Sequence, residues 1–165
     1  MSQAVARDDS EAAAAIATLK SPETYLGYWR VDRFASPGGL VRDRPAAYRS
    51  APLSLNDWAF EGRWLVGRQS SRSLAAGAKI HMRFHARDLH LVLASRGGKP
   101  LRFRVTLDGK APGADAGGDV DANGFGTIRG ERLYQLVRNK TEVRERDFTI
   151  EFLDPGAEAF AFTFG

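Results

Sequence analysis

The chain has 165 residues, of which 43% are hydrophobic and 27% charged, a composition typical of one soluble globular domain. The net charge is +4, but arginines alternate with acids, as in Arg42-Asp43-Arg44, so we expect no nucleic-acid partner. The absence of cysteine excludes disulfides and thiol chemistry on this chain. It has no long apolar run and no signal-peptide pattern at its start, so we expect no direct membrane insertion.

The first part of the chain mixes a helical signal with irregular segments. Acids at Asp8–Glu11 precede an alanine-rich stretch that ends at Lys20, which predicts a short capped helix. An extended arm over 23–34 and a long loop over 40–52 should follow. The stretch Trp58–Val66 reads as a short hairpin or bend with its turn at Glu61-Gly62.

Residues 80–107 carry the clearest pattern in the sequence. Apolar residues occupy every second position at 80–84, 89–93 and 101–107, which predicts three strands with one face on a core. Turns at 86–88 and 95–100 would join them as the middle of one antiparallel sheet.

The C-terminal third continues the strand pattern after one long irregular segment. Lys110–Gly126 is rich in glycine and should be a loop. Strands are expected at 131–138, at 148–152 and at 160–164, the last with three phenylalanines on one face. The chain thus predicts an all-β fold, most plausibly a jelly-roll β-sandwich over 21–165, with 1–20 as an N-terminal helix or linker.

Two motifs resemble metal sites. His81 and His85 have a helical metal spacing, but on a strand their side chains leave the chain about 13 Å apart, too far to share an ion. Asp119, Asp121 and Asn123 match the first half of a calcium loop, yet its twelfth position is Gly130 instead of glutamate. We therefore expect no metal and no cofactor, with these three residues as a weak calcium alternative.

No nucleophile or phosphate-loop motif is present, so we do not expect an enzyme, although two acids that meet in space could still act on sugars. Aromatic residues are the remaining signal, because their flat apolar faces suit sugar rings, while many will instead belong to the core. The candidates are Tyr25, Tyr28, Trp29, Trp58, Trp64 and Tyr134.

The strand pattern also predicts where charged ligand contacts would lie. If the core faces alternate as described, Arg83 and His85 on one strand and Arg102 and Arg104 on another share one solvent face. Beside an aromatic platform, such as Tyr134, Trp58 or Trp64, they would favour an acidic glycan through bidentate pairing. The competing interpretation is that these arginines only keep the sheet soluble.

Several stretches resemble the C-terminal module of DipZ-type thiol:disulfide interchange proteins of bacteria, in matching order. They are Ser21–Arg30, Leu53–Trp64, Ile80–Leu93, Arg102–Gly113, Arg132–Arg138 and Glu151–Gly165. In that family a membrane-embedded domain and a thioredoxin-like domain precede a module similar to carbohydrate-binding modules. The resemblance implies a jelly-roll fold and an extracytoplasmic, periplasmic location, and it lends no ligand residues.

These observations predict a non-catalytic binding module that works beside a thioredoxin-like, cytochrome c biogenesis-type system. Its partner would be a cell-envelope glycan or the thioredoxin-like domain. The alternative is a structural domain that docks on that partner and binds no sugar.

Overall fold

The computed structural model describes residue 16 and residues 18–165; the predicted N-terminal helix lies almost entirely outside them. The strands are β1 (Thr24–Tyr25), β2 (Ala46–Tyr48), β3 (Trp58–Val66), β4 (Ser71–Ser73), β5 (Ala78–Phe84), β6 (Asp88–Ser95), β7 (Leu101–Leu107), β8 (Phe125–Ile128), β9 (Arg132–Arg138), β10 (Arg146–Phe152) and β11 (Ala157–Phe164). Two 3-10 helices, η1 (Tyr28–Arg30) and η2 (Gly113–Asp115), interrupt the loops. No helix among the described residues is long and apolar enough to span a membrane.

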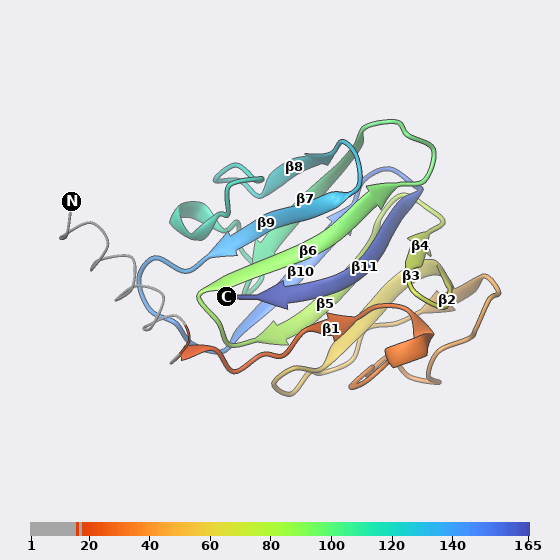
Figure 1. The fold of residues 1–165 in the computed structure, drawn as a ribbon, viewed down its shortest axis with the longest axis horizontal. Helices are drawn as coiled ribbons and strands as arrows, with labels where there is room; N and C mark the ends of the chain where they lie inside the picture. Colours follow the sequence, from red (N-terminus) through yellow and green to blue (C-terminus); the bar gives the residue numbers. More distant parts are fainter. Residues whose placement is uncertain (1–15, 17) are drawn as a thin grey trace.

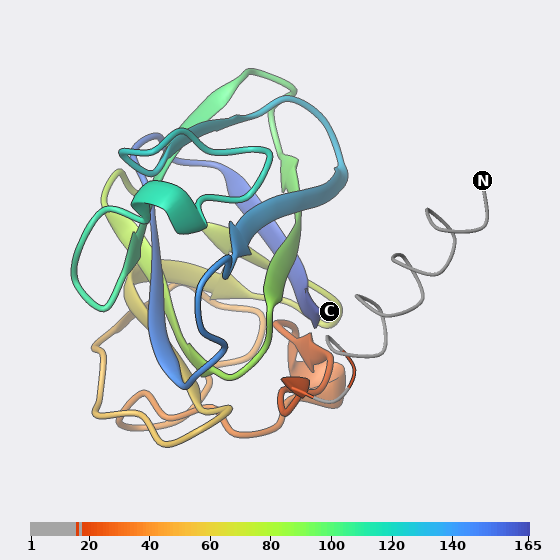
Figure 2. The ribbon, with the colours of Figure 1, turned by 90° about the vertical axis from the view of Figure 1, so that its left-hand side faces the viewer.

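The strands form one hydrogen-bonded path that curls into two layers. Its order is β8-β7-β10-β5-β3-β4-β11-β6-β9, with β1 added to β11 and β2 to β3, and these strands pair antiparallel. In Figure 1 the layer of β9, β6 and β11 lies in front of the layer of β7, β10 and β5, and Figure 2 shows the layers from the side. The predicted all-β sandwich is confirmed.

β3 joins the two layers through a bend. Its first half, Trp58–Glu61, pairs with β5, whereas its second half pairs with β2 and β4. Gly62 lies at the crossing with φ +88°, where a side chain would meet Ala78. Of the two interpretations of this stretch, the bend is therefore right and the hairpin wrong, because the strand continues into the other sheet.

The predicted grouping of the three central strands into one sheet is wrong. β10 lies between β5 and β7, and β6 belongs to the other layer, between β11 and β9. Alternation shows which side chains face the core, and it does so for either layer, so it cannot show which strands are neighbours.

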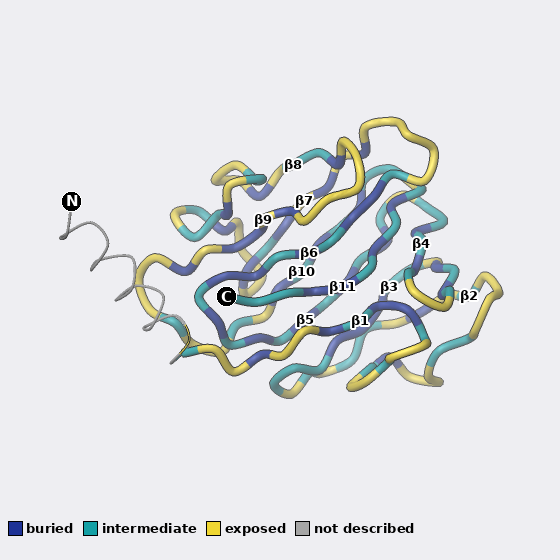
Figure 3. The backbone as a smooth tube through the Cα atoms, in the orientation of Figure 1, coloured by how far each residue is buried: buried dark blue, intermediate teal, exposed yellow. Residues whose placement is uncertain are grey.

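The core lies between the layers, and buried positions alternate along the strands (Figure 3). Its largest fully buried side chains are Trp58, Trp64, Tyr134, Phe60, Phe84, Phe103, Phe148, Phe152, Phe162, Leu26, Ile80 and Met82. Phe60 stacks on Trp64 with ring centres 4.4 Å apart.

A bulge in β11 changes which phenylalanines share a face. The pairing of β11 with β6 slips between Ala159 and Ala161, so Phe162 and Phe164 stack together while Phe160 lies on the outer side of the sheet. The prediction of three phenylalanines on one face is therefore wrong for Phe160.

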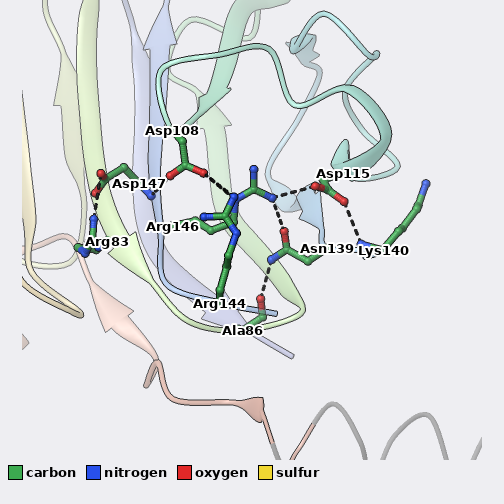
Figure 4. Close-up of polar contacts among 9 residues, drawn as sticks. All are labelled: Arg83, Ala86, Asp108, Asp115, Asn139, Lys140, Arg144, Arg146 and Asp147. Atoms are coloured by element: carbon green, nitrogen blue, oxygen red, sulfur yellow. Dashed lines mark hydrogen bonds and ion pairs between the residues drawn. The ribbon is translucent and has the colours of Figure 1, made fainter. Parts of the chain in front are cut away.

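A polar network closes one end of the sandwich (Figure 4). The guanidinium of Arg146 donates to Asp108 at 2.9 Å, to Asp115 at 2.8 Å and to the amide oxygen of Asn139 at 2.7 Å. Asn139 in turn donates to the carbonyl of Ala86 at 2.8 Å. These bonds tie three connections, β5–β6, β7–β8 and β9–β10, to the start of β10 and explain how loops without regular structure are held in place.

Candidate functional site

The predicted arginine face exists, but acidic residues neutralise much of it. Arg83 and Arg104 belong to one sheet, and β10 runs between their strands. Arg83 pairs with Glu145 at 2.9 Å and with Asp147 at 3.0 Å. Figure 4 shows the pair with Asp147. This surface is consequently a cross-strand ladder of opposite charges.

The other arginines of this face also have partners within the chain. Arg102 forms a bidentate pair with Asp154, through two nitrogen–oxygen distances of 2.9 and 3.1 Å. That hydrogen bonding lowers the pKa of Asp154 to about 2. The guanidinium of Arg104 lies over the ring of Phe125, 5.3 Å from its centre.

His81 on β5 and His85, which follows β5, face different neighbours. The Nδ1 atom of His81 lies 2.9 Å from the hydroxyl of Thr149, and burial lowers the pKa of this imidazole. His85 follows the end of β5, and its Nδ1 lies 2.8 Å from the carbonyl oxygen of Thr18. The main-chain amide of His85 also donates to the hydroxyl of Ser21 at 2.9 Å, so His85 fastens the N-terminal segment to the sandwich.

The predicted aromatic platform is wrong for Trp58, Trp64 and Tyr134, which are all fully buried. The indole of Trp58 donates to the carbonyl of Asp32, and that of Trp64 donates to the carbonyl of Glu61. The hydroxyl of Tyr134 donates to the carbonyl of Gly130. Each ring packs in the core and satisfies its polar atom internally, so none can stack on a ligand.

The carboxylates of the calcium-like loop accept hydrogen bonds from other groups of the chain. Asp119 accepts from the guanidinium of Arg132 at 2.8 Å and from the amide of Gln135 at 2.7 Å. The hydrogen bond from Arg132 lowers the pKa of Asp119. Asp121 accepts from the amides of Asn123 and Phe125, which makes the loop a local turn. Across residues 18–165 no group of three His, Cys, Asp or Glu side chains is placed to hold a metal ion.

A pocket of about 290 Å³ lies on the outer side of the other layer, beside η1. We call it the Trp29 pocket. Its lining residues are Tyr25, Gly27, Trp29, Arg30, Arg68, Gln69, Phe160 and Ala161. Trp29 is 55% exposed, the most exposed aromatic side chain in the part of the chain that the structure describes. In Figure 1 η1 is the short orange helical turn near β1 and β4.

Arginine side chains cover the aromatic rings around this pocket. The guanidinium carbon of Arg68 lies 4.1 Å from the centre of the Trp29 ring. That of Arg30 lies 5.2 Å from the Tyr25 ring, and its Nη1 donates to the Tyr25 hydroxyl at 3.3 Å. Cation–π contact of this kind holds both partners in place.

Main-chain hydrogen bonds hold the pocket in shape. The amides of Tyr28 and Trp29 donate to the carbonyls of Gly67 and Arg68, at 2.9 and 3.0 Å. A side chain at Gly27 would come within 2.5 Å of the Arg68 carbonyl oxygen, so only glycine allows this approach. The pocket is therefore built on rigid backbone contacts.

Sequence reasoning named Tyr25 and Trp29 as aromatic candidates but missed Arg30, Arg68 and Phe160. The β11 bulge turns Phe160 outward, and the β3–β4 turn brings Arg68 over Trp29. Neither event has a local sequence signal, although Ser-Pro at 21–22 and Gly27 mark this segment as irregular.

The model of the family described as "Thioredoxin like C-terminal domain" matches residues 21–165. The chain belongs to this family. The predicted resemblance to DipZ is confirmed as well.

Proteins named DipZ from Mycobacterium bovis and Mycobacterium tuberculosis are each 28% identical to this thioredoxin-like C-terminal domain over 146 residues. The match covers 88% of this chain and only 18% of the length of each relative.

Solved structures with a similar arrangement of strands include carbohydrate-related proteins. A family two carbohydrate esterase from Clostridium thermocellum, in complex with cellohexaose, is 14% identical with a TM-score of 0.43, over 59% of this chain and 27% of that chain. CsCBM6-3 from Clostridium stercorarium, in complex with cellobiose, is 12% identical with a TM-score of 0.36, over 58% of this chain and 72% of that chain.

Proposed function

We propose that this domain is a non-catalytic module that binds a glycan in the Trp29 pocket. The exposed ring of Trp29, beside Tyr25 and Phe160 in one preformed pocket, is the observation that carries the proposal. Sugar rings present apolar C–H faces that pack on aromatic rings, and their hydroxyls need polar neighbours. The side chains of Gln69, Arg30 and Arg68 supply those neighbours.

The lining of the pocket supports binding without catalysis. It contains no carboxylate, histidine, serine or cysteine that could act as a general acid, a general base or a nucleophile. Its aromatic and guanidinium groups are suited to bind and orient a ligand.

The DipZ relatives support the cellular setting that we propose. As the C-terminal module of a DipZ-type protein, the domain would work in the periplasm or another extracytoplasmic compartment, beside a thioredoxin-like domain. It would contribute no cofactor and no redox group of its own. A cell-envelope glycan is the ligand within reach there.

A second candidate function is docking on the thioredoxin-like domain without sugar binding. One cross-strand row on the outer face, Tyr25–Ala161–Val92–Leu133, is apolar over four strands. Leu133 is 39% exposed. The other layer carries charge pairs on its outer face, so this row is the better protein-docking surface of the two.

Binding of the isolated chain to a panel of cell-envelope glycans tests the first candidate. We expect saturable binding that Trp29→Ala abolishes, whereas Phe125→Ala, which removes another exposed ring, leaves it unchanged. If Trp29→Ala binds as well as the wild type, the pocket is not the site.

Binding to the thioredoxin-like domain of a DipZ relative tests the second candidate. Leu133→Glu should weaken that complex, while Trp29→Ala should not. A complex that Leu133→Glu leaves intact excludes the apolar row as its contact.

A further inference from the structure

We propose that the Trp29 pocket selects glycans that carry an anionic group, a carboxylate or a phosphate, and that Arg30 and Arg68 bind this group. The inference rests on the proposed function and deepens it. The arginines of the molecule differ in their partners. Arg83, Arg102 and Arg146 each form ion pairs, at 2.8 to 3.0 Å. Within the described part of the chain, no carboxylate lies within 4.0 Å of the guanidinium of Arg30 or Arg68, since neither forms an ion pair.

The described acidic residues of this region form no ion pair with Arg30 or Arg68. Glu23 and Asp32 line a neighbouring pocket together with Arg30. The Tyr28 hydroxyl donates to Asp43 at 2.9 Å, and this hydrogen bond raises the pKa of Tyr28. Arg42 lies over the Tyr28 ring, with its guanidinium carbon 4.9 Å from the ring centre. Arg30 belongs to η1, while Arg42 and Arg68 lie over the rings of Tyr28 and Trp29. The guanidinium groups of Arg30 and Arg68 contact aromatic rings and form no ion pair with a described residue, so they remain available to an anion.

Stacking on aromatic rings prepares Arg30 and Arg68 for an anion. A guanidinium whose face lies on a ring still presents N–H groups at its edge, and their fork matches the two oxygens of a carboxylate or phosphate. Because Trp29 and Tyr25 already hold the two side chains, little rotamer entropy remains to be lost on binding. The aromatic rings and the guanidinium groups then lie side by side, so an acidic sugar could contact both at once.

The pocket is lined by three aromatic side chains, those of Tyr25, Trp29 and Phe160. A pyranose ring on Trp29 or Tyr25 would bring a carboxylate on its own C6 close to a guanidinium. The aromatic surface makes a sugar the better partner than an inorganic anion, which would use the arginines alone.

The test compares ligands that differ in one group. Isothermal titration uses a uronic-acid oligosaccharide, its carboxyl-reduced neutral counterpart and the corresponding sugar phosphate. We expect at least one acidic sugar to bind about tenfold or more tightly than the neutral sugar, a gap that narrows as salt is added. Uronate and phosphate as separate ligands show which anion the pocket prefers.

Variants that remove one charge show which arginines cause the higher affinity for the acidic sugar. Arg68→Gln and Arg30→Gln should each lower the affinity for the acidic sugar about tenfold and leave that for the neutral sugar within about twofold. Arg129→Gln, which removes an exposed arginine on the β8–β9 connection, is the charge control and should change neither. Trp29→Ala should weaken both sugars.

The outcomes separate this inference from the proposed function. Equal affinity for acidic and neutral sugars, unchanged in Arg30→Gln and Arg68→Gln, overturns the anion selectivity while the glycan pocket stands. Equal losses in Arg129→Gln and Arg68→Gln would show long-range charge instead of a site and would also overturn it. No binding of any sugar overturns the proposed function and this inference with it.

Discussion

The guanidinium of Arg68 lies 4.1 Å from the centre of the Trp29 ring, although the two residues belong to different connections of the fold. The β3–β4 turn provides the arginine, and the 3-10 helix after β1 provides the indole. Their contact forms one wall of the Trp29 pocket. The shape of the pocket therefore depends on how firmly these two connections are joined.

The tryptophans should differ sharply in their contribution to stability. Trp64 is fully buried and stacks on Phe60, so Trp64→Ala should lower the free energy of unfolding by about 3–5 kcal/mol. Trp29→Ala should change it by less than about 1 kcal/mol, because the ring is 55% exposed. Chemical denaturation followed by circular dichroism measures both. Similar losses in the two variants would contradict the assignment of Trp29 to a binding surface.

Gly27→Ala should distort the backbone junction on which the pocket is built. The new methyl group would meet the carbonyl oxygen of Arg68 at 2.5 Å, so the two connections must move apart. We expect a loss of about 1–3 kcal/mol in unfolding free energy and weaker glycan binding. Gly97→Ala is the matched control, since no atom lies within 4 Å of the added group. Unimpaired binding by Gly27→Ala would show that this junction does not shape the site.

Arg146→Ala should destabilise the end of the sandwich shown in Figure 4. Its side chain is only 12% exposed and pairs with Asp108 and Asp115. Its loss leaves Asp115 without its guanidinium partner and Asp108 with the more distant Arg144 alone. We expect a loss of about 2–3 kcal/mol in unfolding free energy. Arg144→Ala removes a 53% exposed arginine that reaches Asp108 at 3.4 Å, and it should cost less than about 0.5 kcal/mol. Equal losses of unfolding free energy in Arg146→Ala and Arg144→Ala would show that the network does not stabilise this end of the sandwich.

Stability should fall in acid through specific aspartates. Burial alone would raise the pKa of Asp108, but hydrogen bonds from the Asp147 amide and from Arg146 outweigh it and lower that pKa. The pKa of Asp119 is lowered by Arg132, and that of Asp154 falls to about 2 through Arg102. Lowered native pKa values mean that the unfolded chain binds more protons, so this stability is present above the unfolded pKa and is lost as pH falls through the native values.

Urea unfolding at a series of pH values measures this dependence. We expect a slight decrease of the midpoint below about pH 6.5, because the unfolded chain protonates His81 there while burial lowers the pKa of the native imidazole. A steep decrease should follow between about pH 4 and about pH 2. Arg102→Gln should make the decrease shallower, because the pKa of Asp154 then returns toward its ordinary value. A midpoint that rises in this acidic range would have the wrong sign for the carboxylate pairs.

The sequence predicts those parts of the molecule that follow a local pattern. Alternation at Ile80, Met82 and Phe84 identifies core positions, and all three are fully buried. The same pattern does not reveal that β6 lies in the opposite layer, because pairing between distant strands leaves no local mark. The bulge that turns Phe160 outward cannot be recognised in the sequence either, because it adds one residue to the strand without a change in residue type.

The binding site was only partly predictable for a related reason. Composition cannot separate the exposed ring of Trp29 from the buried rings of Trp58 and Trp64. Arg68 is distant in sequence from Trp29 and lies over it only because β3 crosses between the layers and turns back at Gly67. Likewise, Arg83 appears free in the sequence, but β10 places Asp147 beside it.

The central claim is that Trp29 contacts a glycan, and the indole N–H signals of the chain test it most directly. The indoles of Trp58 and Trp64 donate to the main-chain carbonyls of Asp32 and Glu61, whereas that of Trp29 lies at the pocket. In a nitrogen–proton correlation spectrum titrated with an acidic cell-envelope oligosaccharide, the Trp29 indole signal should shift saturably while the other two stay in place. Saturable binding that leaves the Trp29 signal unmoved would contradict the account.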